Sequence, residues 1–197
     1  MEVFRQPLED REVTISRAKF TVSYPCSFML VASMNPSPSG YFNSDKKGSA
    51  HSSHEMERYL GKIFGPLLDR IDLHIDVSPV PFEKLSDRVP AEPSETIREH
   101  VAKARRIQSL RFKENGKVHY NAQMSSRQIR VFCELDAVSL KLLKNAMERL
   151  SLSARAYDRI LKVARTIADL EGVDSVHALH IAEAIQYRSL DREGWLG

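Results

Sequence analysis

One asparagine stands where a polar side chain could take part in chemistry. Asn35 follows the apolar run SFMLVAS (residues 27–33), which is typical of a buried strand, and prolines and a glycine come directly after it. In open α/β sheets, ligands bind beyond the carboxyl ends of the strands. An uncharged amide placed there could orient a water molecule or a phosphate oxygen, as phosphoryl transfer requires. The alternative is that Asn35 only caps the turn before Pro36.

A second candidate is an arginine at the entry to another predicted strand. Arg70 lies in the segment GPLLDRIDL (residues 65–73), between Asp69 and Asp72. At a domain edge, its guanidinium could reach a triphosphate bound to a neighbouring subunit. The alternative is a structural ion pair with a nearby carboxylate.

Two further arginines lie one helical turn apart. Arg155 and Arg159 are spaced i and i+4 at the start of a predicted helix, so both project from one face near an N-terminus that attracts anions. The alternative is a solvated basic surface, with Asp158 and Lys162 pairing nearby.

The first half of the chain must position Asn35 and Arg70, and its pattern is that of an α/β fold. Residues 11–25 alternate apolar and polar side chains on both sides of a bend at residues 17–19, which predicts a hairpin. Continuous apolarity predicts a buried strand at residues 28–33, and alternation predicts another at residues 71–77. Residues 36–54 are rich in Pro, Gly and Ser and predict a long loop.

The second half is predicted to be all helical, with a domain boundary near residue 93, so that the domains are 1–92 and 93–197. Ser94 is the expected cap of the first helix, whose stripe holds Ile97, Val101, Ala104, Ile107 or Gln108, and Leu110. Further helices are expected from Ser125, from Asp136, at residues 153–172, and at residues 175–187 with Asp174 or Ser175 as cap. The apolar positions are Tyr157, Ile160, Leu161, Ala164, Ile167 and Ala168, then Ala178, Ile181, Ala182 and Ile185.

The composition fits a globular protein of 197 residues with a formal net charge of +3, which neither requires nor excludes a polyanionic partner. Cys26 and Cys133 are far apart and form no metal-type spacing, so we expect reduced thiols in a cytoplasmic protein. No apolar stretch is long enough to cross a bilayer, and we expect no membrane association.

Five segments together resemble one family. They are FRQPLEDREVTISRA, NPSPSGY, GPLLDRIDL, SARAYDRILKVARTIADLEG and HIAEAIQYR, in this order along nearly the whole chain. The sequence thereby resembles the C-terminal half of the magnesium-chelatase-like AAA+ ATPases of the competence-protein (ComM/YifB) type. The resemblance implies a partial AAA+ core, made of a hairpin and the C-terminal strands of a parallel sheet, followed by an all-helical lid domain.

The resemblance also implies roles for individual residues. Asn35 corresponds to sensor 1, Arg70 to the finger that acts on the adjacent subunit, and Arg155 to sensor 2 of the lid. The hairpin resembles the pre-sensor-1 insertion, so Arg17 and Lys19 at its tip would face DNA. The implied whole protein is an ATP-driven ring, expected to be a hexamer, that binds ATP and Mg²⁺ and acts on DNA.

Two departures from the family pattern change what this chain can do. It contains no P-loop of the form GxxxxGK[ST] and no acidic Walker B strand, so we expect a fragment that binds no ATP or Mg²⁺ and is inactive alone. Many relatives have cysteines where Ser37 and Ser39 stand here. His51 and His54 remain, but without thiolates they predict no metal site.

A basic run in the first helix of the second half leaves another function open. It holds Arg98, Lys103, Arg105, Arg106, Arg111 and Lys113, which could follow a phosphate backbone or form a solvated surface. The alternative to the motor is therefore a non-catalytic module that binds nucleic acid or protein. A third alternative is a metal-chelatase subunit, but the sequence contains no residues that would bind a macrocycle.

Overall fold

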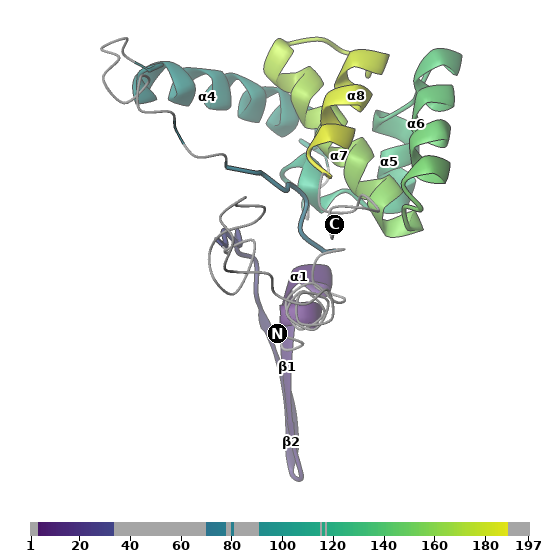
Figure 1. The fold of residues 1–197 in the computed structure, drawn as a ribbon. Coiled ribbons are helices and arrows are strands. Elements are labelled where there is room, and N and C mark those ends of the chain that lie inside the picture. Colours follow the sequence, from purple (N-terminus) through teal and green to yellow (C-terminus); the bar gives the residue numbers. More distant parts are fainter. Residues whose placement is uncertain are drawn as a thin grey trace, which may run out of the picture. The chain divides into compact units, whose positions relative to one another are not determined.

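The computed structural model describes residues 4–33, 70–77, 80, 91–114, 116 and 118–188. The chain divides into two compact units, the first ending at Ile71 and the second beginning at Asp72. Figure 1 shows two strands and one short helix in the first unit and the remaining helices in the second. The boundary near residue 93 stays a prediction, because residues 81–90 lie outside the described part.

The first unit contains the predicted hairpin, which is confirmed. A short helix, α1 (Arg5–Asp10), leads into β1 (Glu12–Arg17) and the antiparallel β2 (Phe20–Pro25). Arg17 pairs with Phe20, so residues 18–19 form a two-residue turn. In Figure 1 the hairpin is a long ribbon whose turn lies at the end away from α1.

The other two predicted strands are wrong. Residues 28–33 and 71–77 form no strand, and the sheet in the described residues is the antiparallel pair β1–β2. Apolar side chains in both segments are exposed, with Met29 at 85% and Val77 at 84%. A strand exists through hydrogen bonds to a neighbouring strand, and none lies beside these segments in the described residues. The described residues therefore do not contain the parallel sheet that was expected for an AAA+ core.

The second unit is helical, as expected. It contains α4 (Ser94–Arg111), the 3₁₀ turn η2 (Asn121–Gln123), α5 (Ser126–Phe132), α6 (Ala137–Arg149), α7 (Ala154–Glu171) and α8 (Ala178–Gln186). None of the described helices combines the length and the apolarity needed to span a membrane.

Side-chain caps fix three of these helix starts where the sequence places them. Ser125 accepts a hydrogen bond from the N–H of Gln128, Asp136 from Ser139, and Ser153 from Ala156. The hydrogen bond from the N–H of Ser139, at 2.7 Å, lowers the pKa of the Asp136 carboxyl.

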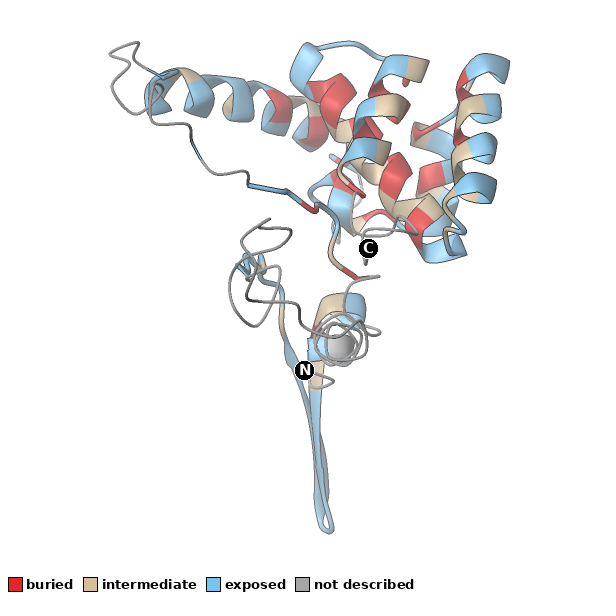
Figure 2. Cartoon of the chain, viewed as in Figure 1, coloured by how far each residue is buried: buried red, intermediate tan, exposed pale blue. Residues whose placement is uncertain are grey.

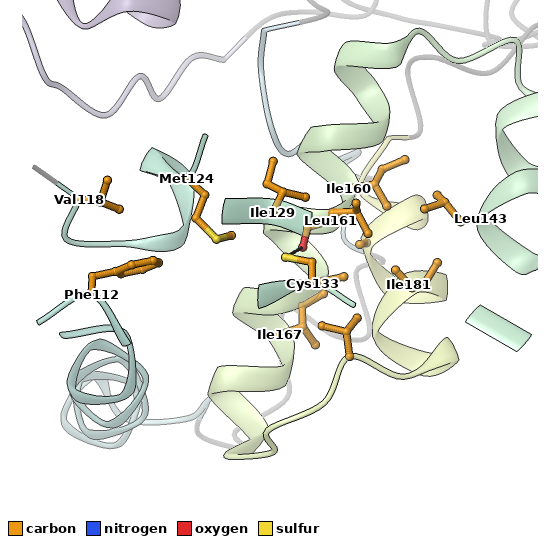
Figure 3. Close-up of a cluster of buried hydrophobic side chains, with 13 residues drawn as sticks. Phe112, Val118, Met124, Ile129, Cys133, Leu143, Ile160, Leu161, Ile167 and Ile181 are labelled. Atoms are coloured by element: carbon orange, nitrogen blue, oxygen red, sulfur yellow. Dashed lines mark hydrogen bonds between the residues drawn. The ribbon is translucent and has the colours of Figure 1, made fainter. Parts of the chain in front are cut away.

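The central element of the helical unit is α7, which packs against α4, α5, α8 and η2. Its predicted apolar face is confirmed: it is buried except for Tyr157, which is half-buried. Figure 2 shows the buried positions gathered where the helices meet, and Figure 3 shows the apolar side chains that fill this space. The helix ends at Gly172, whose φ of 81° is a left-handed conformation that glycine adopts without strain.

Two details of the predicted helices need correction. In α4, Ile97, Val101 and Leu110 are exposed, and the buried stripe is reduced to Ala104 and Gln108 with Ile107 partly buried. The N-cap of α4 is Pro93 rather than Ser94, and it makes no side-chain capping bond. Only the second half of α4 therefore contributes to the core.

The last helix begins later than predicted. Its N-cap is His177, whose N–H donates to Nδ1 of His180 at 2.9 Å, rather than Asp174 or Ser175. The preceding residues are engaged elsewhere, because the carbonyl of Asp174 accepts from Arg165 and Val176 forms a bridge with Leu135. These contacts hold the chain extended until residue 177.

Truncating the core side chain of α8 should destabilise the helical unit strongly. We expect Ile181→Ala, at a side chain with 0% exposure, to lower the free energy of unfolding by about 2–5 kcal/mol, because it removes buried methyl groups and leaves a cavity. The matched control is Leu179→Ala in the same helix, at 80% exposure, which should change it by less than about 0.5 kcal/mol. Urea unfolding followed by helical circular dichroism measures both, and equal losses would contradict the packing described.

Candidate functional site

Part of the predicted site lies outside the described residues, namely Asn35, Ser37, Ser39, His51 and His54. The role of Asn35 as sensor 1 therefore stays a prediction.

Arg70 is described, and its side chain is almost fully buried. Its Nη2 lies 2.8 Å from Oε1 of Glu9 in α1, and the side chains are 1% and 32% exposed. The sequence suggested Asp69 or Asp72 as its partner; Glu9, far away in the sequence, pairs with it, and Asp69 lies outside the described residues. A guanidinium binds a carboxylate through its N–H groups, and two oxygens of a tetrahedral phosphate group can accept the same pair of N–H bonds.

Arg155 lies in the first turn of α7, and its side chain is exposed. The capping bond from the N–H of Ala156 to Ser153 fixes the direction in which this turn leaves the loop. The position is suitable for an anionic ligand, because the side-chain charge adds to the partial positive charge of the helix N-terminus.

Arg159, one turn further along α7, has a defined partner. Its Nη1 donates to Oδ1 of Asp72, and its side chain is only 18% exposed. The sequence suggested Asp158 as a neighbour, but Asp158 instead accepts a hydrogen bond from the hydroxyl of Ser126 at 2.9 Å. Arg159 is therefore partly buried and ion-paired to Asp72, whereas Arg155, one turn earlier, is exposed.

The segment that follows Arg70 is attached to the helical unit at two points. Asp72 is paired with Arg159, and the N–H of His74, a residue that is 5% exposed, donates to the carbonyl of Tyr187 at 2.7 Å. This segment was predicted to be a strand. Its printed contacts are instead with Arg159 of α7 and with Tyr187, the residue that follows α8, and Ile75 and Val77 are exposed.

The basic run of α4 is not a continuous solvated surface. Arg111 is 13% exposed and binds Asp169 of α7 with two nitrogens, at 2.7 and 2.5 Å, and it also donates to Oδ1 of Asn121 at 2.9 Å. The guanidinium of Arg105 lies 4.3 Å from the ring centre of Tyr120. The remaining cations of the run, Arg98, Lys103, Arg106 and Lys113, are exposed.

Asp169 has a second cationic partner inside the same helix. Nε of Arg165 donates to Oδ1 of Asp169 at 3.1 Å, and its Nη atoms donate to the carbonyls of Val173 and Asp174. Burial lowers the pKa of the Arg165 guanidinium, and the charge of Asp169 opposes this effect. The cluster of Arg111, Arg165, Asp169 and Asn121 is therefore a structural centre that joins α4, η2 and α7.

The buried cysteine, Cys133, is not a candidate for nucleophilic chemistry. Both thiols are free. Sγ of Cys133 donates to the carbonyl of Leu161 at 3.6 Å, as Figure 3 shows, and burial raises the pKa of this thiol to about 12. The thiolate is thus scarce at neutral pH. No group of three His, Cys, Asp or Glu side chains within the described part could hold a metal ion.

Comparison with known families matches both halves of the chain. The family model described as magnesium chelatase, subunit ChlI, matches residues 1–85, and the model of the C-terminal part of the same subunit matches residues 91–188. The chain belongs to the magnesium-chelatase-like family. The resemblance that was inferred from its motifs is thereby confirmed.

Two curated relatives cover almost the whole chain. It is 42% identical to the competence protein ComM of Haemophilus influenzae and 38% identical to the uncharacterised protein YifB of Escherichia coli, over 98% of its length in both cases. The chain spans 36% and 37% of these two proteins, just over a third of their length.

Breaking the buried ion pair should destabilise the helical unit. We expect Arg111→Ala to lower the free energy of unfolding by about 3 kcal/mol, because Asp169, with 0% side-chain exposure, loses its bidentate partner while Arg165 still compensates part of its charge. Arg106→Ala, at an exposed position of the same helix, is the control. Equal small effects in urea unfolding would show that the cluster contributes little.

The attachment of residues 72–74 should depend on Arg159. We expect Arg159→Ala and Asp72→Ala each to speed hydrogen exchange of the His74 amide by roughly 2- to 5-fold, because the pair is partly exposed and contributes about 0.5–1 kcal/mol. The double variant should exchange no faster than either single variant. Additive effects of the two substitutions would contradict a direct pair.

Proposed function

We propose that this chain carries the sensor, finger and lid of a magnesium-chelatase-like AAA+ ATPase, and that the intact protein is an ATP-driven ring motor acting on DNA. Membership of the family supports the proposal, and so does similarity to a relative named as a competence protein. In this proposal Arg70 is the finger, Arg155 is sensor 2, and Asn35 is sensor 1.

The observation that carries the proposal is the attachment of Asp72 to Arg159. One residue separates Arg70 from Asp72 in the sequence, and one helical turn separates Arg155 from Arg159. A movement of α7 in response to nucleotide at Arg155 would therefore pull on the segment that continues from Arg70. Such a link between lid and finger would be of no use to a passive binding module.

The chemistry assigned to Arg70 is stabilisation of charge on a triphosphate bound by the adjacent subunit. Glu9 holds the guanidinium in this chain. In the ring, phosphate oxygens would replace the Glu9 carboxylate, because both acceptors take two parallel N–H bonds. Fingers of this kind contribute about 10³- to 10⁵-fold in rate.

Asn35 would orient the attacking water, and Arg155 would bind a phosphate of the nucleotide held by its own subunit. Mg²⁺ would supply further charge neutralisation. The described residues include no carboxylate cluster suited to this ion, so none of them is assigned to it. Arg17 and Lys19, which are exposed at the hairpin tip, would neutralise phosphates of DNA.

Mixing experiments test the finger. In the intact protein that contains this chain, we expect Arg70→Ala subunits, added to wild-type subunits below equal amounts, to reduce ATP turnover by more than their share, because each removes the finger from a neighbouring site. Arg106→Ala, an exposed arginine of α4, is the control and should leave the turnover unchanged. A loss linear in the fraction of Arg70→Ala subunits would contradict action across the interface.

A further inference from the structure

The two faces of the hairpin have different chemistry. The strand register places Val13 opposite Tyr24, Ile15 opposite Val22, and Arg17 opposite Phe20. Paired residues point to the same side of a two-stranded sheet, and alternate pairs share a face. One face therefore carries five apolar side chains and one arginine; we call it the apolar face. It consists of Val13, Ile15, Arg17, Phe20, Val22 and Tyr24.

The opposite face is lined with hydroxyl groups. Oγ1 of Thr14 lies 2.9 Å from Oγ of Ser23, and Oγ of Ser16 lies 2.9 Å from Oγ1 of Thr21. These cross-strand bonds satisfy the hydroxyls in pairs and offer no apolar surface. A ligand that seeks apolar contact can therefore use only one side of the ribbon.

The apolar face is exposed in this chain. Phe20 is 58% exposed, Tyr24 54% and Ile15 47%. Exposed aromatic and aliphatic side chains gathered on one face mark an interaction surface more often than chance exposure does. The two rings differ in place, because Phe20 adjoins the turn while Tyr24 lies near the base of the hairpin.

Positive charge is concentrated at the end where Phe20 lies. Arg17 is the cross-strand partner of Phe20, and Lys19 is in the turn between them. Glu12 is the one carboxylate in the sequence of residues 11–25, and it lies at the other end of β1 on the hydroxyl face. A partner of this tip should thus combine negative charge with an apolar or aromatic surface.

We propose that the apolar face of the hairpin binds single-stranded DNA, with an unpaired base stacked on Phe20 and the adjoining phosphates neutralised by Arg17 and Lys19. This inference rests on the proposed action on DNA and specifies the strand state that the tip recognises. Base stacking on an aromatic ring, combined with cations along the backbone, is the general chemistry of single-strand binding.

An unpaired strand fits the surface better than the alternatives do. In a duplex the bases are already stacked, so contact with Phe20 requires unstacking a step at a cost of a few kcal/mol. Arg17 and Lys19 would still attract duplex phosphates, but Phe20 would add nothing. A second copy of the hairpin would bring like charges without a carboxylate on this face, so charge complementarity favours a polyanion.

Binding of labelled oligonucleotides to the 197-residue chain, followed by fluorescence anisotropy at several salt concentrations, tests the inference. We expect Phe20→Ala to weaken single-strand binding by roughly 5- to 100-fold and to leave duplex binding and the salt dependence unchanged. The control is Val22→Ala, an apolar residue of the same face, which should have a much smaller effect. Phe20→Trp should keep or strengthen binding, whereas Phe20→Leu should not, and this pair distinguishes stacking from hairpin stability.

The tip cations provide the separate test of DNA contact. Arg17→Ala and Lys19→Ala should each weaken binding to single strands and duplexes alike and reduce the salt slope by about one. Suppose that both cation variants weaken binding as expected, but Phe20→Ala weakens binding to single strands and duplexes equally, or weakens neither. The stacking inference is then overturned, and the proposed DNA contact stands. If the cation variants bind normally, the DNA contact itself is wrong. A Phe20→Ala effect on oligomeric state alone would assign the face to a second copy instead.

Discussion

The helical unit depends on one buried carboxylate. Asp169 has 0% side-chain exposure, and an ionised carboxylate in such a place is tolerated only when cations and hydrogen-bond donors surround it. Arg111 from α4 and Arg165 from α7 supply the cations, and the amide of Asn121 donates to Oδ2 at 2.7 Å. These bonds form only at particular distances and angles, so they fix the position of α4 and η2 against α7. Apolar packing alone would define this position less sharply.

With its C-terminal half fixed in this way, α7 can present its N-terminal half to other segments. Ile160, Leu161 and Ala164 face the core, while Arg155 and Arg159 point away from it. The two arginines have the same spacing as an ordinary surface pair, yet Arg159 binds Asp72 and Arg155 is exposed. One helix thus carries an exposed arginine and, one turn later, an arginine that is ion-paired to the chain segment that follows Arg70.

The hairpin forms strands, whereas residues 28–33 and 71–77 do not, although all have the side-chain pattern of a strand. The difference shows that this local pattern is not sufficient to form a strand. In the hairpin, a two-residue turn brings β1 and β2 together, so each strand supplies the other's hydrogen-bond partners. Residues 28–33 and 71–77 have equally suitable side chains but no neighbouring strand in the described residues. The second of these segments finds its partners on helices instead, through Asp72 and the backbone of His74.

The sequence by itself determined the features that arise within a few residues. The hairpin turn, the caps at Ser125, Asp136 and Ser153, and the buried face of α7 follow from local hydrogen bonds and helical periodicity, and the family follows from its motifs. Only the tertiary structure decided which charged groups are engaged. Arg111 meets Asp169 across 58 residues and Arg159 meets Asp72 across 87, and no periodic signal encodes such a pairing. An ion pair depends on where the folded chain brings two side chains, so identical basic residues become part of a buried cluster, as Arg111 does, or a link to a distant segment, as Arg159 does.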